Sequence, residues 1–243
     1  MSHKIGVIAV GGKGTRLGRR NTQKCLIQIE GKPLVEYTIE IYEQLGVEKI
    51  FLLTGFLHEQ VEMYVRQRKT TSSTTVECIF GGVEGEVAAI LKLQPLISGD
   101  FLYAGGDCIF SFSSLEKLIQ DGANIGTHIA AMSVNLLTGV VPEHPKALLS
   151  RESKFIEKIV SPDHSGPNLF TVMGLYYFKP GVFEILNTVL SGSKHTSDFI
   201  KHAVRADKKV LASTTRAPWF CIHTQKDLAR WRNSKMKKHL LGK

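Results

Sequence analysis

The sequence predicts an α/β fold, in which helices flank a mostly parallel sheet and an antiparallel excursion occupies the second half. Short apolar runs rich in β-branched residues alternate with segments of helical period up to about residue 121. Such alternation is typical of right-handed strand–helix–strand units, which build a parallel sheet. After residue 126 the expected strands follow one another more closely, which favours antiparallel pairing. The expected architecture is therefore Rossmann-like in its first half.

The expected strands cover residues 5–10, 49–53, 76–80, 100–104, 127–133, 155–160, 171–178, 209–213 and 218–223. The expected helices cover residues 33–45, 57–68, 86–94, 113–121, 180–190, 196–206 and 224–238. The first of these helices shows the signals most clearly. Pro33 stands in its first turn, and Gly46 follows its last turn as a stop signal. Between them, Leu34, Ile41 and Leu45 share one apolar face.

Composition is that of an ordinary globular protein. The 243 residues are 43% hydrophobic and 22% charged, which argues against extensive disorder. No apolar run approaches the ~20 residues of a membrane span, so we expect no membrane partner. The four cysteines include no C-x-x-C pair. We therefore expect no disulfide framework and predict the cytoplasm as the compartment.

The positive charge is concentrated at one end of the chain. The net charge is +9, and the stretch from Arg216 to Lys243 contributes +7 of it, with eight basic residues and one acid. A near-neutral body with a basic end does not favour nucleic acid as a partner. We predict one domain over residues 1–243 that ends in a basic helix at about 224–238.

The first expected strand leads directly into a glycine-rich loop that reads GGKGTRLG at residues 11–18. Gly11, Gly12 and Gly14 lack side chains where backbone N–H groups can converge on phosphate oxygens. Arg16 adds a planar, permanently charged group that suits a phosphate. The P-loop pattern fails because Gly14 stands where it needs a serine or threonine. The dinucleotide-binding G-x-G-x-x-G pattern fails because Leu17 stands where it needs its third glycine. The loop therefore predicts a phosphate site of a third type.

Three motifs follow one another at short spacing between residues 11 and 37. The loop reads G-G-x-G-T-R-L, the QKCL of residues 23–26 resembles P-K-P-[LM], and the GKPLVEY of residues 31–37 is similar to G-K-P-[LM]-[LIV]-x-[YH]. In this order and spacing they resemble the motifs of the sugar-phosphate nucleotidylyltransferases, which have a glycosyltransferase-A-like α/β fold. The resemblance implies an enzyme that joins a nucleoside triphosphate to a sugar 1-phosphate and releases pyrophosphate.

The resemblance also assigns roles to individual residues of these motifs. It implies that the backbone of Gly11, Gly12 and Gly14 binds the nucleotide, with Thr15 alongside. Arg16 is then expected to bind the departing pyrophosphate, and Lys24 to neutralise charge near the α-phosphate. Both reactants are polyanions, so in-line attack on the α-phosphorus needs cations and N–H donors that offset their repulsion.

A single carboxylate follows the strand expected over residues 100–104. Gly105 and Gly106 separate that strand from Asp107. An acid delivered by a strand end suits a Mg²⁺ ligand, and the resemblance agrees, because the family has a metal-binding acid here. The alternative is a helix-capping Asp, but three serines that follow already offer caps. We therefore predict Mg²⁺ as the cofactor, with Asp107 as its ligand.

Three further positions are assigned through the resemblance. Gly85 begins a segment similar to G-T-[AG]-x-A, which lies near the base and sugar, although Glu86 replaces the threonine. Gly174 lies in a segment similar to the strand near the sugar; a bulge glycine in an ordinary core strand is an equal alternative. Lys158 is a candidate for the lysine of the family's E-K-P, which contacts the sugar phosphate. A second alignment places residues 160–162 there and loses both charges.

The second metal-binding motif of the family, W-x-D-[IV]-G-[TS]-x-x-D, aligns with residues 219–227, but Cys221 stands in place of its first Asp. A neutral thiol is a poor ligand for Mg²⁺. Cys221 and His223 share a strand face, but two ligands on one strand do not make a metal site, so we predict none there. Asp227 is expected to cap the last helix.

The sequence thus predicts a Mg²⁺-dependent nucleotidylyltransferase of nucleotide-sugar biosynthesis, whose partners are a nucleoside triphosphate and a small phosphorylated acceptor. Two alternatives stay open. One is the same reaction on heptose phosphate, phosphocholine or another small phosphate, and the other is a regulatory relative that binds nucleotide without turnover. The sequence names neither the nucleoside nor the acceptor, and it leaves assembly into a homo-oligomer open.

Overall fold

The parallel half of the sheet carries the first strands of the chain. The computed structural model describes residues 4–18, 21–82, 84–126, 128–135, 144–151, 154–189 and 195–241. Its parallel strands here are β1 (Ile5–Ala9), β4 (Lys49–Thr54), β5 (Thr75–Phe80) and β6 (Phe101–Gly105). β1 pairs with β4 on one side and β6 on the other, and β4 pairs with β5. Buried apolar side chains dominate β1, β4 and β6, as in a sheet covered on both faces.

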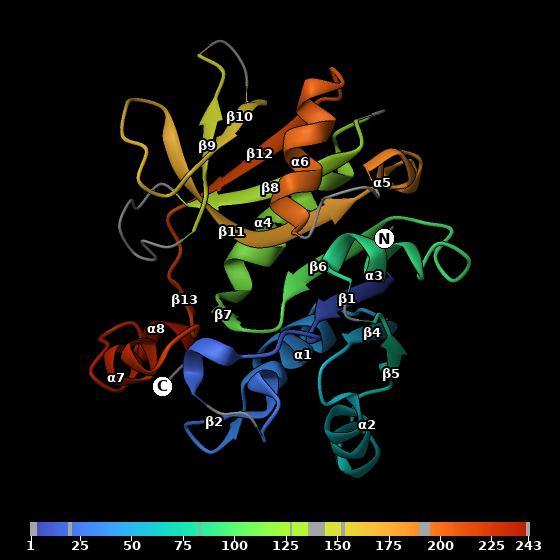
Figure 1. The fold of residues 1–243 in the computed structure, drawn as a ribbon, viewed down its shortest axis with the longest axis vertical. Helices are drawn as coiled ribbons and strands as arrows, with labels where there is room; N and C mark the ends of the chain where they lie inside the picture. The colour runs from blue at the N-terminus through green and yellow to red at the C-terminus, as the bar shows by residue number, and fades with distance from the viewer. Residues whose placement is uncertain are drawn as a thin grey trace.

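The second half of the chain extends this sheet with mostly antiparallel strands (Figure 1). They are β8 (Ala130–Asn135), β9 (Lys146–Leu149), β10 (Ile156–Val160), β11 (Leu169–Phe178) and β12 (Val210–Thr215). β11 pairs antiparallel with β6, β8 and β9, and β12 lies parallel to β8. The described residues thus form a nine-stranded sheet with the order β10-β9-β11-β6-β1-β4-β5, to which β8 and β12 are added beside β11.

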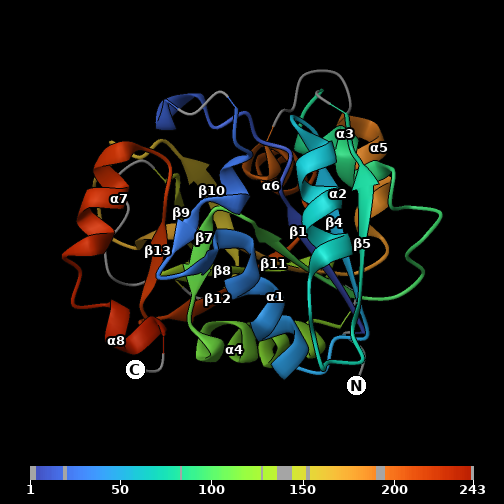
Figure 2. The same ribbon diagram turned by 90° about the horizontal axis from the view of Figure 1, so that it is seen from below.

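Helices cover both faces of the sheet (Figure 2). α3 (Glu86–Leu91), α5 (Val182–Val189) and α6 (Thr196–Arg205) pack on one face, in a core that includes Ile90, Leu186 and Phe199. α1 (Leu34–Gln44), α2 (His58–Gln67) and α4 (Phe112–Ala123) contribute to the core of the other face. The result is a three-layer α/β arrangement.

Two short ribbons complete the structure beside the sheet. β2 (Gln28–Ile29) pairs with β3 (Lys32–Pro33), and β7 (Cys108–Phe110) pairs antiparallel with β13 (Trp219–Cys221). The chain then forms α7 (Gln225–Arg232) and α8 (Lys237–Leu240). These helices pack against the β1–α1 connection in a third apolar core that includes Leu17 and Trp231.

The α/β fold predicted from the sequence is confirmed, including the antiparallel second half. The basic helix expected over 224–238 was wrong in its length, because α7 ends at Arg232 and α8 starts at Lys237. Thr224 is the N-cap of α7, and Asp227 contributes to the cap from the third helical position: its Oδ2 accepts from the N–H of Thr224 at 2.8 Å, and the Thr224 hydroxyl accepts from the N–H of Asp227. No helix in the described part of the chain is long and apolar enough to cross a membrane.

Candidate nucleotide and phosphate site

A cavity of about 500 Å³ lies at the carboxyl ends of β1, β4 and β6. Ligands of open α/β sheets bind beyond these strand ends, and the volume suits a small organic molecule. The structure brings most of the predicted site residues to its wall. Those that line it are Gly11, Gly12, Gly14, Thr15, Arg16, Lys24, Gly85 and Asp107.

The loop after β1 has a backbone that depends on its glycines. Gly14 has a φ of 60°, in the left-handed region that favours glycine, and a Cβ there would lie 3.1 Å from Cβ of Lys24. A Cβ on Gly11 would lie 3.2 Å from the backbone nitrogen of Gly55. At Gly12, by contrast, a Cβ would meet no atom of the described residues within 4 Å. The loop is therefore held closely at Gly11 and Gly14 and is open to a ligand at Gly12.

Gln23 fastens this loop to the segment that follows it. Gln23 is only 1% exposed. Its Nε2 donates to the backbone carbonyl of Val10 and, at 3.2 Å, to that of Gly12. Its Oε1 accepts from the N–H of Cys25 at 2.8 Å. A buried amide that is satisfied at both ends rigidifies its surroundings. Sequence analysis missed this residue, since the only signal was a polar side chain where the related motif has a proline.

Asp107 is positioned by close packing of the turn after β6 against β1. The N–H of Gly106 donates to the carbonyl of Ala9 at 2.9 Å. A Cβ on Gly106 would lie 2.6 Å from Cγ1 of Val10, which real side chains do not tolerate without a shift. The predicted Gly105-Gly106-Asp107 turn therefore requires glycine at its second position, and it presents the carboxylate at the cavity wall.

Two basic groups surround the Asp107 carboxylate. Lys24 Nζ lies 2.6 Å from Asp107 Oδ2, and His223 Nε2 lies 3.3 Å from the same oxygen. Burial opposes ionisation of this acid, but the charge of Lys24 and the contact with His223 outweigh it and hold the pKa of Asp107 well below its usual range. The carboxylate is therefore ionised throughout the neutral pH range.

Glu86, where the resemblance called for a threonine, is held in place at the cavity wall. Its Oε1 accepts from the Tyr103 hydroxyl at 3.0 Å, and its Oε2 accepts from the N–H and hydroxyl of Thr196, each at 2.9 Å. Beside it, Gly85 adopts a φ of 125°, which side chains rarely allow. Sequence analysis missed the Tyr103 and Thr196 contacts, because they join residues far apart in the chain.

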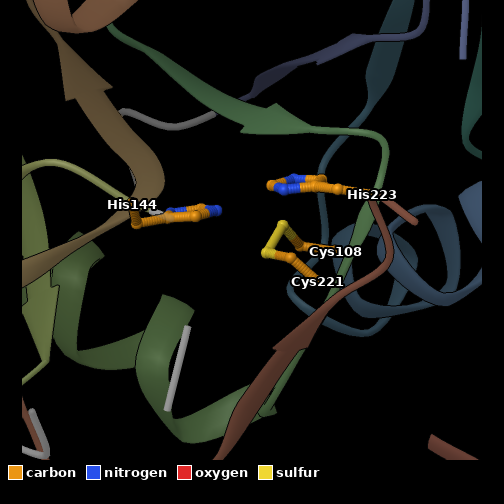
Figure 3. A group of neighbouring side chains, drawn as sticks. All are labelled: Cys108, His144, Cys221 and His223. Atoms are coloured by element: carbon orange, nitrogen blue, oxygen red, sulfur yellow. A yellow bond between two sulfur atoms is a disulfide. The ribbon is translucent and has the colours of Figure 1, made fainter. Parts of the chain in front are cut away.

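Cys221 lies beside Asp107, but in a covalent link rather than as a metal ligand. β13 and β7 place Cys221 directly opposite Cys108, and a disulfide joins the two residues (Figure 3). The expectation that the cysteines form no disulfides was therefore wrong. C-x-x-C spacing was the wrong criterion, because strand pairing brings these cysteines together across a sequence separation of 113 residues.

Two predicted substrate residues lie outside the cavity lining. Lys158 is exposed on β10. Gly174 has a φ of 78° and lies where the register of β11 against β8 shifts between Val172 and Tyr176. That geometry matches the bulge glycine that the sequence left open as an alternative.

Comparison with known proteins points to one family. The profile of the family described as "Nucleotidyl transferase" matches residues 5–234. The bifunctional protein GlmU of Methanocaldococcus jannaschii is 28% identical over 207 residues, which cover 83% of this chain and 47% of that protein. This chain thus spans about half the length of the curated relatives that it matches.

Two solved structures share the fold. The inositol-1-phosphate CTP transferase from T. maritima has a TM-score of 0.77 at 19% identity, with 99% of this chain and 98% of that chain covered. A UDP-glucose pyrophosphorylase complexed with UDP-glucose has a TM-score of 0.80 at 18% identity, with 97% and 99% covered. The fold is therefore shared along nearly the whole of each chain.

Proposed function

Because the chain belongs to the nucleotidyl transferase family, we propose that it transfers a nucleotidyl group from a nucleoside triphosphate to a sugar 1-phosphate, with release of pyrophosphate. One observation carries this proposal. The ion pair between Lys24 and Asp107 lines the same cavity as the glycine loop, at the carboxyl ends of β1 and β6. Backbone donors, cations and one carboxylate are the groups that a triphosphate and its metal require.

The loop after β1 is the part suited to the triphosphate. The open face at Gly12 lets phosphate oxygens approach the backbone, since no atom of the described residues lies within 4 Å of where a Cβ would stand. Lys13 and Arg16 line the same cavity and add positive charge. We assign the β- and γ-phosphates to this loop, where Arg16 stabilises the departing pyrophosphate.

The residues present fit a divalent metal at Asp107. Magnesium is typically held by one or two carboxylates, with water and substrate phosphates completing its coordination. Asp107 supplies one ionised carboxylate, whereas Cys221, which aligns with the family's second acid, is bound in the disulfide and offers no oxygen. We therefore assign Mg²⁺ to Asp107 and the triphosphate together. When bound, it supplies charge neutralisation at the α-phosphate.

The reaction then needs no nucleophile from the protein. An oxygen of the acceptor phosphate attacks the α-phosphorus in line and forms a new P–O bond. The bond from the α-phosphorus to the oxygen that bridges to the β-phosphate breaks, and pyrophosphate leaves. Lys24 neutralises the charge that builds up on the α-phosphate, and Arg16 stabilises the leaving pyrophosphate. The hydrogen bonds of Gln23 to Gly12 and Cys25 hold the glycine loop in place relative to Lys24 during this step.

The structure supports the assignment of the acceptor less than that of the nucleoside triphosphate. Lys158, the residue expected to contact a sugar phosphate, does not line the cavity. Other small phosphates, such as a heptose phosphate or phosphocholine, therefore belong in the substrate test beside hexose 1-phosphates.

Pyrophosphate release tests the proposal. The protein is incubated with Mg²⁺ and each of the four nucleoside triphosphates, against a panel of sugar 1-phosphates and other small phosphates. We expect pyrophosphate to form only with a matched pair, and Asp107→Ala to abolish it. A wild-type protein that binds a triphosphate but releases no pyrophosphate with any acceptor would favour the regulatory alternative.

A further inference from the structure

Four side chains with affinity for soft metals gather in one cluster (Figure 3), and two of them contact Asp107. They come from β7, from the segment before β9, from β13 and from the residues after β13: Cys108, His144, Cys221 and His223. One potential ligand atom from each lies within 4.8 Å of those of the other three. Figure 3 shows the two imidazoles reaching toward each other from opposite sides, with the two sulfur atoms beside them. Neither Cys108 nor His144 was part of the sequence argument about this region.

His144 is already oriented as a metal ligand would be. Its Nδ1 lies 2.8 Å from the backbone carbonyl of Val172, and a carbonyl only accepts, so Nδ1 carries the proton. The lone pair of the neutral ring is then on Nε2. Histidines that bind metals almost always donate their other ring N–H to a carbonyl or carboxylate in this manner.

His223 has the second arrangement of that kind. Its Nε2 faces the ionised Asp107 carboxylate at 3.3 Å, so a neutral ring carries its proton on Nε2 and its lone pair on Nδ1. A carboxylate, a histidine and a metal in series are a common unit of zinc sites. The rings of His144 and His223 lie parallel, with an interplanar angle of 4° and centroids 5.2 Å apart. Both rings are thus fixed by contacts outside the cluster.

We propose that Cys108, His144, Cys221 and His223 bind one Zn²⁺ ion when the Cys108–Cys221 disulfide is reduced. A thiol reductant gives two electrons and two protons to the disulfide, so that the S–S bond breaks and two thiols form while the reductant is oxidised to its own disulfide. Zinc then binds both sulfurs as thiolates, and two protons are released. The disulfide form and the zinc form exclude each other.

The geometry suits this ion. A tetrahedral zinc site with two sulfurs at ~2.3 Å and two nitrogens at ~2.0–2.1 Å separates its ligand atoms by about 3.3–3.8 Å. The present spread of up to 4.8 Å therefore needs shifts of about 1 Å, with the sulfurs moving apart. Two thiolates and two imidazoles form a common structural zinc set, and they are poor ligands for magnesium.

Such a site would hold one wall of the cavity in place. It would join the β7–β13 ribbon to the segment before β9, and through His223 it would reach the Asp107 carboxylate. The metal proposed here is separate from the Mg²⁺ assigned to Asp107, because its ligands are the sulfur and nitrogen atoms of four other side chains.

Metal titration of the full chain tests the proposal. Protein cleared of metal with EDTA is prepared in two forms, oxidised and reduced, and each is titrated with Zn²⁺ against a competing chelator in excess Mg²⁺. We expect one equivalent of tightly bound zinc in the reduced form and none in the oxidised form. Substitution with Co²⁺ should give the d–d bands of a tetrahedral ion and a thiolate charge-transfer band.

Matched variants locate the site. Cys108→Ser and His144→Gln should weaken zinc binding by more than the roughly 10–100-fold that loss of an outer partner costs, whereas Asp107→Asn should fall within that range. Cys78→Ser, at a free cysteine outside the cluster, should bind zinc like the wild type. If a substitution prevents folding, the proposal is tested by comparing the cobalt spectra of the reduced and the oxidised wild-type protein. A reduced protein without stoichiometric zinc, or a cobalt spectrum without the thiolate band, would overturn the proposal.

Discussion

Asp107 separates two walls that are built in different ways. The first wall is the glycine loop with Lys24, all within a short stretch after β1. The second wall is His223, which lines the cavity and is backed by the stacked ring of His144 and by the Cys108–Cys221 disulfide. The two cysteines meet because β7 pairs with β13, across a sequence separation of 113 residues. Residues on one strand and the loop that follows it can be predicted from their spacing in the sequence. Residues that come together through pairing of distant strands are identified only in the folded structure.

The largest effect is expected on the first wall, from Lys24→Met. This change removes the cation 2.6 Å from the Asp107 carboxylate and leaves the charge of both reactants less well neutralised. We expect kcat/KM to fall by about 100–1000-fold, as for the loss of one preorganised electrostatic group. Steady-state pyrophosphate release measures it.

The matched control for that variant is Lys117→Met. Lys117 also forms a lysine–aspartate pair, with Asp121, but on the surface of α4 away from the cavity. Its activity should equal that of the wild type. If the two variants turn over at the same rate, Lys24 has no part in the reaction.

On the second wall, His144 should make the stability of the fold depend on pH. Burial lowers the pKa of His144 to about 4, whereas an unfolded histidine titrates near pH ~6.5. Between these values the unfolded chain binds more protons, so stability is lost as the pH falls from ~6.5 toward 4. The loss is at most about 3 kcal/mol.

Comparison of wild type with His144→Gln isolates this contribution. Both are kept in the disulfide form without metal, and the free energy of unfolding is measured by urea denaturation at several pH values. The wild type should lose stability relative to the variant below pH ~6.5. Parallel pH profiles would show that the ring is not held neutral by the fold.

The smallest effect concerns the turn that joins the walls. Gly106→Ala places a Cβ 2.6 Å from Val10 Cγ1 and 2.8 Å from the carbonyl oxygen of Ala9. We expect destabilisation of about 1–3 kcal/mol, as for overpacking in a core. At Gly99, a Cβ would meet no described atom within 4 Å, so Gly99→Ala should show no such loss. Equal free energies of unfolding for the two variants would contradict the close packing of this turn.

These contrasts explain what the sequence could and could not predict. Strands β1, β4 and β6 were located within about one residue, because long apolar runs mark buried parallel strands. β7 and β9 were missed, since each is only three or four residues long and carries no period of its own. The glycine loop was predicted from its spacing after a strand, Asp107 from its place after another strand, and Lys24 from the resemblance to the nucleotidylyltransferase motifs; all three line the cavity.

The remaining contacts of the site depend on tertiary structure. Gln23 is recognisable only once its burial is known, and His144 lies far along the chain from Cys108 and Cys221, beside which the fold places it. Cys221 and His223 share a strand face that is evident from the sequence, but the pairing of that strand with β7 is not. The cluster therefore became visible only when β13 was paired with β7.

A structure of the protein with a non-hydrolysable nucleoside triphosphate and Mg²⁺ would show directly whether the glycine loop and Asp107 bind the triphosphate and its metal. We expect the β- and γ-phosphates against the backbone of residues 11–15 and the metal between Asp107 and the phosphates. Phosphates bound elsewhere, with Lys24 and Asp107 still paired to each other and no metal beside them, would contradict this assignment.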